Sequence, residues 1–260
     1  MPLLEIEDVS KSFRGLRAVA RATFAIERHT IGALIGPNGA GKTTLFNLIA
    51  GLYRADGGAI RFNGRSIGGL PPHRVCAAGI GRTFQLVKPF AGLSVLDNTI
   101  VGALCGERTV ASARLRALGV LERLGLAGKA SLLAAHLTLA DRRRLEVARA
   151  LATRPSLLLL DEVMAGLRPA EIDELVGGLR DLQRDEGITI LLTEHVMRAV
   201  MALADQIIVL HHGEVIARGE PTAIVRAPAV LACYLGEDAS SDGDGDGDGD
   251  GAGPGDGARS

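Results

Sequence analysis

The first part of the chain alternates apolar and polar positions in the manner of antiparallel strands. Residues 3–9 alternate apolar with acidic side chains, which predicts a half-buried strand. Residues 18–26 and 59–62 have the composition of further strands, and the Asn63-Gly64 pair is a turn signal. We therefore expect a β-rich, antiparallel N-terminal portion.

A different pattern, in which a short apolar run is followed by an amphipathic segment, occurs three times. The runs are typical of buried parallel strands and occupy residues 31–35, 156–160 and 188–193. The segments that follow them have helical spacing and occupy residues 45–50, 171–184 and 196–204, before two last strands at 207–210 and 215–219. Because strands that alternate with helices form parallel sheets, the predicted fold class is α/β.

Residues 87–150 interrupt this alternation, since they are rich in Leu, Ala and Arg at helical spacing. They predict an inserted α-helical subdomain within one domain that covers residues 1–236. The remaining residues, 237–260, are a Gly/Asp-rich tail with almost nothing apolar, and we expect them to be disordered.

Composition and charge narrow the function classes. The 260 residues are 47% hydrophobic, which is ample for a core, and no apolar run approaches the ~20 residues of a membrane-spanning helix. Residues 237–260 hold eight acidic residues and one basic residue, so the rest of the chain carries about +6. This surplus is compatible with a surface near a nucleotide or an anionic membrane face. The three cysteines are widely spaced, which predicts reduced and buried thiols.

The strongest chemical signal is the segment Gly36-Pro37-Asn38-Gly39-Ala40-Gly41-Lys42-Thr43-Thr44, which matches G-x-x-x-x-G-K-[ST] at every fixed position. It lies between an apolar strand pattern and a helical pattern, which is the context that the motif requires. Glycines let successive N–H groups turn toward phosphate oxygens, and the helix behind the loop adds its positive N-terminal end. Lys42 is expected to contact the β- and γ-phosphates, and the Thr43 hydroxyl to bind Mg²⁺.

Two carboxylates end the second apolar run. Asp161 and Glu162 follow residues 157–160, at the carboxyl end of the strand, where open α/β sheets bind ligands. Asp161 is expected to hold Mg²⁺ through water, and Glu162 to orient or deprotonate an attacking water.

Three further features are weak when each is taken alone. Gln85 follows the β-rich portion and can contact Mg²⁺ or water, and His195 ends the third apolar run, where it can hydrogen-bond a γ-phosphate. Thr138 and Asp141 have the spacing of a capping-box-like helix start, which is another anion-binding end. An ordinary polar residue, a core histidine and a capped surface helix are the alternative interpretations.

In this order the motifs resemble those of the ATP-binding subunit of ABC transporters, over residues 3–236. The corresponding segments are 36–44 for Walker A, Gln85 for the Q-loop, 137–141 for the signature, 157–162 for Walker B and His195 for the switch histidine. Phe13 falls where the family stacks an aromatic ring on adenine. The resemblance implies a P-loop NTPase (RecA-like) core that binds ATP and Mg²⁺.

Finer features are similar to the LivG-type ATPases of branched-chain amino acid importers. They are carried by residues 13–16, 45–51, 79–85, 143–151, 165–167 and 234–236. ATPases of urea or other small-solute importers remain an alternative, as does a largely non-hydrolytic regulatory ATP-binding subunit. A soluble ABC ATPase of DNA repair or translation usually has a long coiled-coil insertion or a second ATPase domain, and we expect neither here.

The resemblance implies a catalytic set in which Glu162 is the general base, His195 stabilises the transferring charge and Gln85 links hydrolysis to movement. Thr43, Gln85 and Asp161 would be the Mg²⁺ ligands.

It also implies partners. ATP would lie between Walker A of one chain and the signature residues, including Thr138 and Ala140, of a second ATP-binding subunit that is identical or paralogous. Transmembrane permease subunits would dock on apolar residues near Gln85, with Phe84, Val87 and Phe90 as candidates. A periplasmic or extracellular solute-binding protein would take part indirectly, and no nucleic acid is implied. The chain would be peripheral, at the cytoplasmic face of the cell membrane.

Several positions depart from the family pattern. Ala140 and Asp141 replace the usual Gly and Gln of the signature, Val163 stands where Pro is usual, and Arg168 replaces the Asp or Asn of the D-loop. Asp141 brings a carboxylate toward a γ-phosphate, unless Arg142 or the helix N-terminus offsets its charge. We therefore expect these changes to leave nucleotide binding intact and to affect activation of the partner subunit's ATP site.

Overall fold

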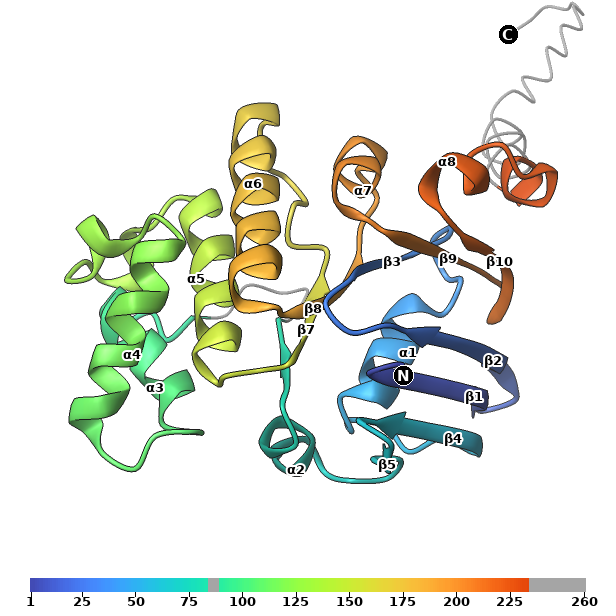
Figure 1. Cartoon of the computed structure of the whole chain (residues 1–260), viewed down its shortest axis with the longest axis horizontal. Coiled ribbons are helices and arrows are strands. Elements are labelled where there is room, and N and C mark those ends of the chain that lie inside the picture. The colour runs from blue at the N-terminus through green and yellow to red at the C-terminus, as the bar shows by residue number, and fades with distance from the viewer. Residues whose placement is uncertain (84–88, 234–260) are drawn as a thin grey trace, which may run out of the picture.

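The computed structural model describes residues 1–83 and 89–233 (Figure 1). Its N-terminal portion contains a four-stranded antiparallel sheet in the order β2-β1-β4-β5, as the alternating pattern predicts. The strands are β1 (Leu4–Phe13), β2 (Leu16–Ile26), β4 (Gly57–Phe62) and β5 (Arg65–Ser66). The β1–β2 hairpin extends beyond the predicted residues because register shifts after Ile6 break the simple alternation without ending the pairing.

The second sheet has six strands in the order β10-β9-β3-β8-β7-β6. They are β3 (Ile31–Ile35), β6 (Ile80–Arg82), β7 (Leu157–Asp161), β8 (Thr189–Thr193), β9 (Gln206–His211) and β10 (Glu214–Gly219). Every pairing in it is parallel except β9 with β10. This confirms the predicted α/β class. The pattern missed β6, which is only three residues long and contains a glycine.

Helices cover both faces of this sheet, and a further group of helices lies beside it (Figure 1). They are α1 (Lys42–Ile49), α2 (Pro72–Ala77), α3 (Val95–Ala103), α4 (Val110–Arg123), α5 (Leu139–Ala152), α6 (Pro169–Glu186), α7 (Met197–Leu203) and α8 (Pro221–Ile224), with 3₁₀ turns η1 (Ala127–Lys129) and η2 (Ala134–His136). The side chains of α1 share a core cluster with strands of both sheets, so α1 lies between them. In contrast, α6 and α7 pack on the opposite face, and α3–α5 form a helical group beside it.

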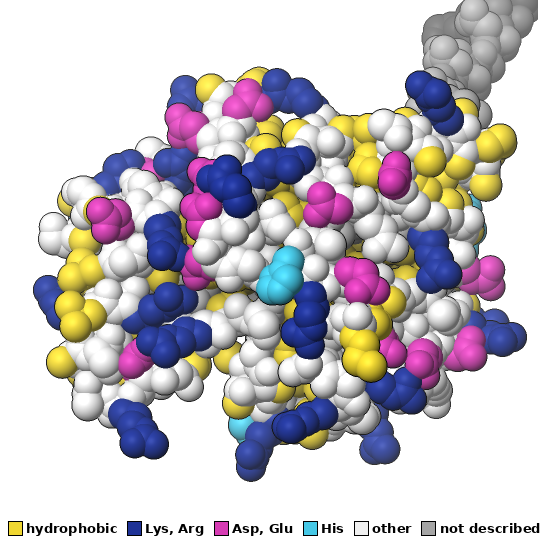
Figure 2. All heavy atoms as spheres, viewed as in Figure 1, with side chains coloured by type: hydrophobic (Ala, Val, Ile, Leu, Met, Phe, Trp, Pro, Cys, Tyr) yellow, Lys and Arg dark blue, Asp and Glu magenta, His cyan; other side chains and the backbone are white. Residues whose placement is uncertain are grey.

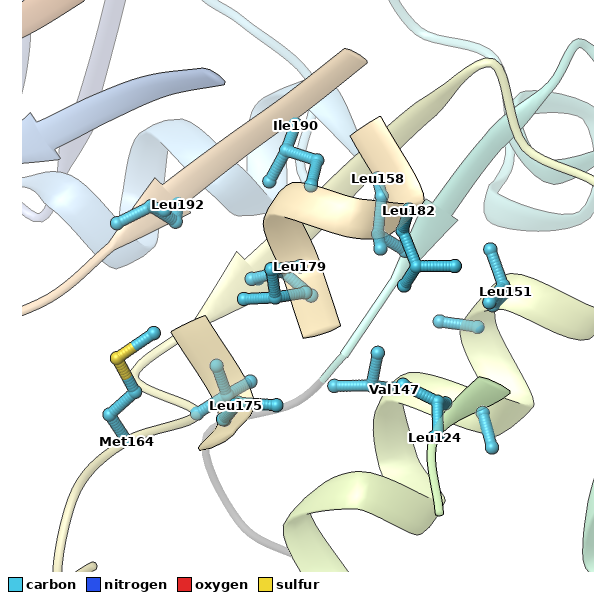
Figure 3. Packing of buried hydrophobic residues seen from close by; sticks show 14 of the residues in the cluster. Leu124, Val147, Leu151, Leu158, Met164, Leu175, Leu179, Leu182, Ile190 and Leu192 are labelled. Carbon is cyan, nitrogen blue, oxygen red and sulfur yellow. The ribbon is translucent and has the colours of Figure 1, made fainter. Parts of the chain in front are cut away.

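The strand β7 explains why the core runs are apolar at every position. Leu157 and Leu159 belong to the cluster around α1, whereas Leu158 and Leu160 belong to the cluster around α5 and α6. Figure 3 shows the second cluster, in which side chains of α6, including Leu179, pack over the strands next to the helical group. Because both faces of β7 are buried, its carboxyl end has little freedom to move.

Lys and Arg side chains are spread over the face that carries α4 and α5 (Figure 2). Within residues 1–83 and 89–233, no helix has the length and apolar character needed to cross a membrane.

The three cysteines differ in exposure, and all three are reduced thiols. Cys233 is buried as expected, Cys76 is half-buried, and Cys105 is exposed, so the prediction of a buried thiol is wrong for Cys105.

Candidate functional site

The loop between β3 and α1 has a backbone conformation that requires glycine. Gly36 and Gly41 have φ angles of +149° and +103°, which L side chains rarely adopt. A Cβ atom at Gly36 would lie 2.0 Å from the Leu210 carbonyl oxygen, and one at Gly41 would lie 2.2 Å from the Ala18 carbonyl oxygen. The strands β9 and β2 therefore hold the loop closely from two sides.

Lys42 is the first residue of α1 and is only 6% exposed. Its Nζ donates hydrogen bonds to the carbonyl oxygens of Gly36, at 2.6 Å, and Pro37, at 2.9 Å. Gly41 at the N-cap has no side chain with which to cap the helix, so N–H groups of the first turn remain available to a ligand. The loop thus combines a compact positive charge with a helix N-terminus, which is the chemistry of a phosphate site.

A hollow of about 660 Å³ opens over this loop. Its lining includes residues 38–44, Glu162 and, from the neighbouring β1–β2 hairpin, Phe13 and Leu16. The Phe13 ring is 38% exposed and lies 5.2 Å from the Tyr53 ring, edge to face. Groups that can donate hydrogen bonds to phosphate, a carboxylate and an aromatic ring therefore line one space that is large enough for a nucleotide.

Asp161, at the end of β7, is 1% exposed, and each of its two carboxylate oxygens accepts one hydrogen bond. Its Oδ1 accepts from Thr193 Oγ1 at 2.8 Å, and its Oδ2 accepts from Arg82 Nη2 at 3.1 Å. Arg82 also donates to Asn47 Oδ1 of α1 at 2.6 Å. Burial lowers the pKa of Arg82, and the charge of Asp161 opposes that shift. A role for Arg82 could not be predicted from the sequence, because its partners Asp161 and Asn47 lie in two distant segments.

Glu162 follows with a φ of +50°, the left-handed region that a non-glycine residue enters only when its surroundings enforce it. Its N–H donates to the Thr193 carbonyl at 3.0 Å, which fixes the turn. Its Oε1 lies 3.1 Å from Nε2 of His195. The predicted base and the predicted switch histidine are thus hydrogen-bonded to each other, and Glu162 faces the hollow.

Glu194, between Thr193 and His195, is a site residue that sequence analysis missed. It is 3% exposed, and its Oε1 accepts a hydrogen bond from the Met164 N–H at 2.9 Å. Burial raises the pKa of Glu194 to about 7, although hydrogen bonds from the backbone of Met164 and His195 work against this shift. The signal for it is an acidic residue directly after a buried apolar strand, the same position that Asp161 and Glu162 occupy in the second run.

The start of α5 carries the departures from the family signature. Thr138 is the N-cap, and its Oγ1 accepts from the Asp141 N–H, which confirms the predicted helix start. Asp141 is 4% exposed and pairs with Lys129 of η1. Ala140 is buried beside it.

The structure therefore brings together most, but not all, of the predicted site. Phe13, the phosphate loop and Glu162 share the hollow, and His195 hydrogen-bonds Glu162. Asp161 directly precedes Glu162 at the end of β7 and is hydrogen-bonded to Thr193 of β8. Thr138 and Ala140 are not among the residues that line the hollow. Gln85 lies outside the described residues.

Known proteins resemble this arrangement in sequence and in structure. The ABC transporter family profile matches residues 19–165. The chain is 38% identical to the high-affinity branched-chain amino acid transport ATP-binding protein BraF of Pseudomonas aeruginosa, over 91% of this chain and 98% of BraF. It is 39% identical to LivG of Escherichia coli K12 over the same shares of the two chains.

Solved structures agree with the sequence relatives. A nucleotide-free ATP-binding cassette of an ABC transporter has a TM-score of 0.83 and 27% identity, over 90% of this chain and 99% of its own. The ADP conformation of the cassette MJ1267 also has a TM-score of 0.83, with 29% identity over 91% of this chain and 99% of its own. The chain therefore belongs to the ABC transporter family, as an ATP-binding, ATP-hydrolysing subunit homologous to LivG and BraF.

Proposed function

We propose that the chain powers import of branched-chain amino acids, as a peripheral subunit at the cytoplasmic face of the cell membrane. The observation that carries the proposal is the hydrogen-bonded pair of Glu162 and His195 at the rim of the phosphate-loop hollow. That pair supports a hydrolytic rather than a purely regulatory subunit. The solute class is supported by the names of BraF and LivG, to which most of the chain is similar.

The residues divide the chemistry among them. Lys42 and the N–H groups at the start of α1 hold the phosphates, and Phe13 stacks on the base. Glu162 orients a water molecule and accepts its proton as that water attacks the γ-phosphorus, while the bond from this phosphorus to the β–γ bridging oxygen breaks and ADP leaves. His195 Nε2–H donates to Glu162 Oε1, which keeps the carboxylate aimed into the hollow and leaves its other lone pairs for the water.

The donor set fits Mg²⁺. This ion prefers oxygen ligands and is usually held by one or two carboxylates together with substrate phosphates, not by an all-protein cage. Thr43 offers a hydroxyl, Asp161 a carboxylate and Gln85 a side-chain carbonyl. The residues in the described ranges form no cluster of three His, Cys, Asp or Glu side chains that could hold a metal ion by themselves. When bound there, Mg²⁺ would neutralise phosphate charge and orient the terminal phosphate.

The partners proposed are a second ATP-binding subunit, identical or paralogous, and a pair of transmembrane permease subunits, with an extracytoplasmic solute-binding protein acting indirectly. Residues 1–236 form the nucleotide-binding domain in this proposal, with residues 87–150 as its helical subdomain and Gln85 as the link to the permease. A hollow of about 270 Å³ beside Arg82, lined by apolar side chains such as Val75 and Val101, supports docking near that point. Of the candidate docking residues, Phe90 is 48% exposed, and Phe84 and Val87 lie outside the described residues.

Glu162→Gln tests the hydrolytic role. The amide keeps the shape of the side chain but cannot accept the proton, so turnover should fall by about 10²–10⁴-fold, the usual contribution of a general base. Affinity for ATP should be retained, because Glu162 does not hold the phosphates. Glu122→Gln, at an exposed position of α4, is the matched control. Near wild-type turnover of the Glu162 variant would remove this residue from the mechanism.

Uptake assays in a deletion strain test the solute. Loss of leucine, isoleucine and valine uptake, restored by the wild-type gene and not by Glu162→Gln, is the expected result. Unaffected uptake of all three, together with lost uptake of urea or another small solute, would overturn the solute assignment and leave the ATPase assignment standing.

A further inference from the structure

Asp141 is a buried carboxylate at the N-terminus of α5, where the family signature carries a neutral side chain. It is 4% exposed, and its Oδ2 accepts hydrogen bonds from Lys129 Nζ at 2.5 Å and from Thr138 Oγ1 at 2.8 Å. Its own N–H donates to Thr138 Oγ1 at 3.2 Å. Lys129, Asp141 and Thr138 thus form one connected group around the first turn of the helix.

Arg142 is not the residue that balances this charge. Its Nε donates to the Leu137 carbonyl and its Nη2 to the Ala135 carbonyl, each at 3.0 Å. The cation on Asp141 comes from η1, twelve residues before it and outside the signature. Backbone hydrogen bonds from Lys129 N–H to the Leu126 carbonyl and from Leu132 N–H to the Lys129 carbonyl fix the turn that places it.

We propose that Lys129 is a positioning residue of the signature. It neutralises Asp141, which in turn holds the Thr138 hydroxyl, so that the start of α5 can meet the γ-phosphate of a nucleotide bound by the second ATP-binding subunit. The inference rests on the proposed pairing of two such subunits. The inference concerns only how the altered signature of this chain can still take part in that pairing.

The charge balance is the physical reason. An uncompensated carboxylate in the first turn would cancel the positive end of the helix and repel the phosphate. With Lys129 in contact, the pair is neutral and the helix end keeps its attraction for an anion. The lysine is also partly solvent-exposed, with 43% of its side chain accessible, so it balances the charge without being buried itself. Of the four lysines in the chain, Lys42 would then contact the phosphates directly, and Lys129 would act through Asp141 from the opposite side of a closed dimer.

The test measures ATP-driven association of the full chain by light scattering in a Glu162→Gln background, with Mg·ATP as the probe. Three variants are compared with this parent: Lys129→Ala, Lys129→Arg, and the double variant Lys129→Ala with Asp141→Asn. Lys129→Ala should weaken association about tenfold or more, because it leaves an uncompensated carboxylate in the first turn of α5. Lys129→Arg and the double variant should both restore it. ATP affinity of the monomer and the unfolding temperature are measured in parallel, since a merely structural role would lower the latter in the double variant as well.

The outcomes separate the inference from the proposed function. Association of Lys129→Ala that equals the parent's would overturn the inference alone. A double variant that stays as weak as Lys129→Ala would also overturn it, because the lysine would then act by itself on the phosphate and not through Asp141. A parent that stays monomeric with Mg·ATP, both alone and with the ATP-binding subunit that co-purifies with it from its native cells, would refute the paired arrangement on which the inference depends.

Discussion

The buried carboxyl of Glu194 makes the stability of the protein depend on pH in a predictable direction. Its pKa is raised from 4.5 to about 7 because the side chain is desolvated at the end of β8. The folded protein therefore binds a proton in the pH range where the unfolded chain has lost it. Stability contributed through this group is intact below pH 4.5 and falls as the pH rises toward about 7, above which the full penalty is present.

The size of the penalty follows from the shift. Each pKa unit corresponds to about 1.4 kcal/mol, so an ionised Glu194 should cost about 3 kcal/mol of unfolding free energy. Glu194→Gln removes the charge and keeps an oxygen that can accept the Met164 N–H bond. Its new NH₂ group costs about 1 kcal/mol if it finds no acceptor. The net gain from the substitution should be about 2 kcal/mol well above pH 7, with a small net loss near pH 5.

Urea unfolding followed by circular dichroism provides the assay, at about pH 5 and about pH 8. The informative quantity is the difference between the variant's effects at the two pH values, which should be about 2–3 kcal/mol and does not depend on the cost of the amide. Glu122→Gln serves as the control, since its side chain is exposed on α4 and should show no such difference. A Glu194→Gln effect that is the same at both pH values would refute the reasoning.

Two further predictions concern nucleotide binding. Gly41→Ala places a Cβ 2.2 Å from the Ala18 carbonyl oxygen at a φ of +103°. ATP affinity, measured by calorimetry, should therefore fall more than about tenfold. Gly39→Ala, with nothing within 4 Å of its Cβ, should lower ATP affinity less. Phe13→Ala should weaken ATP binding about tenfold, because a base stacked on an aromatic ring contributes about 1–3 kcal/mol of binding free energy. Leu16→Ala, in the same hollow, is the control. Equal effects of the two changes on ATP affinity would count against stacking.

The fold was predictable wherever the apolar pattern reflects burial on one or both faces. The runs that became β3, β7 and β8 lie within one residue of their observed bounds, because both faces of these strands are buried and polar residues mark their ends. The extension of β1 to Phe13 was missed, since bulges allow pairing to continue without alternation. The strand β6 was missed because three residues carry too little pattern.

The site was predictable where one segment supplies the whole chemistry, as the phosphate loop does. It was not predictable where a contact joins distant segments. The Arg82–Asp161 pair joins β6 with β7, and the Lys129–Asp141 pair joins η1 with α5. The sequence offered Arg142 as the nearest cation for Asp141, but the helix directs that side chain toward the carbonyls before it. Such partners depend on topology, which local spacing does not contain.

The same topology explains why a costly residue such as Glu194 stands beside the proposed catalytic pair, Glu162 and His195. Thr193 accepts the Glu162 N–H and donates to Asp161, while Glu194 accepts the N–H of Met164, two residues beyond Glu162. The ends of β7 and β8 are therefore tied on both sides of Glu162, whose left-handed backbone needs such support. His195, the residue after Glu194, then lies with its Nε2 3.1 Å from Glu162 Oε1. Glu162 and His195 each follow directly on one of these tied positions, so the hydrogen bonds of Thr193 and Glu194 bring the carboxylate and the imidazole within hydrogen-bond distance, and the buried Glu194 supplies one of those ties.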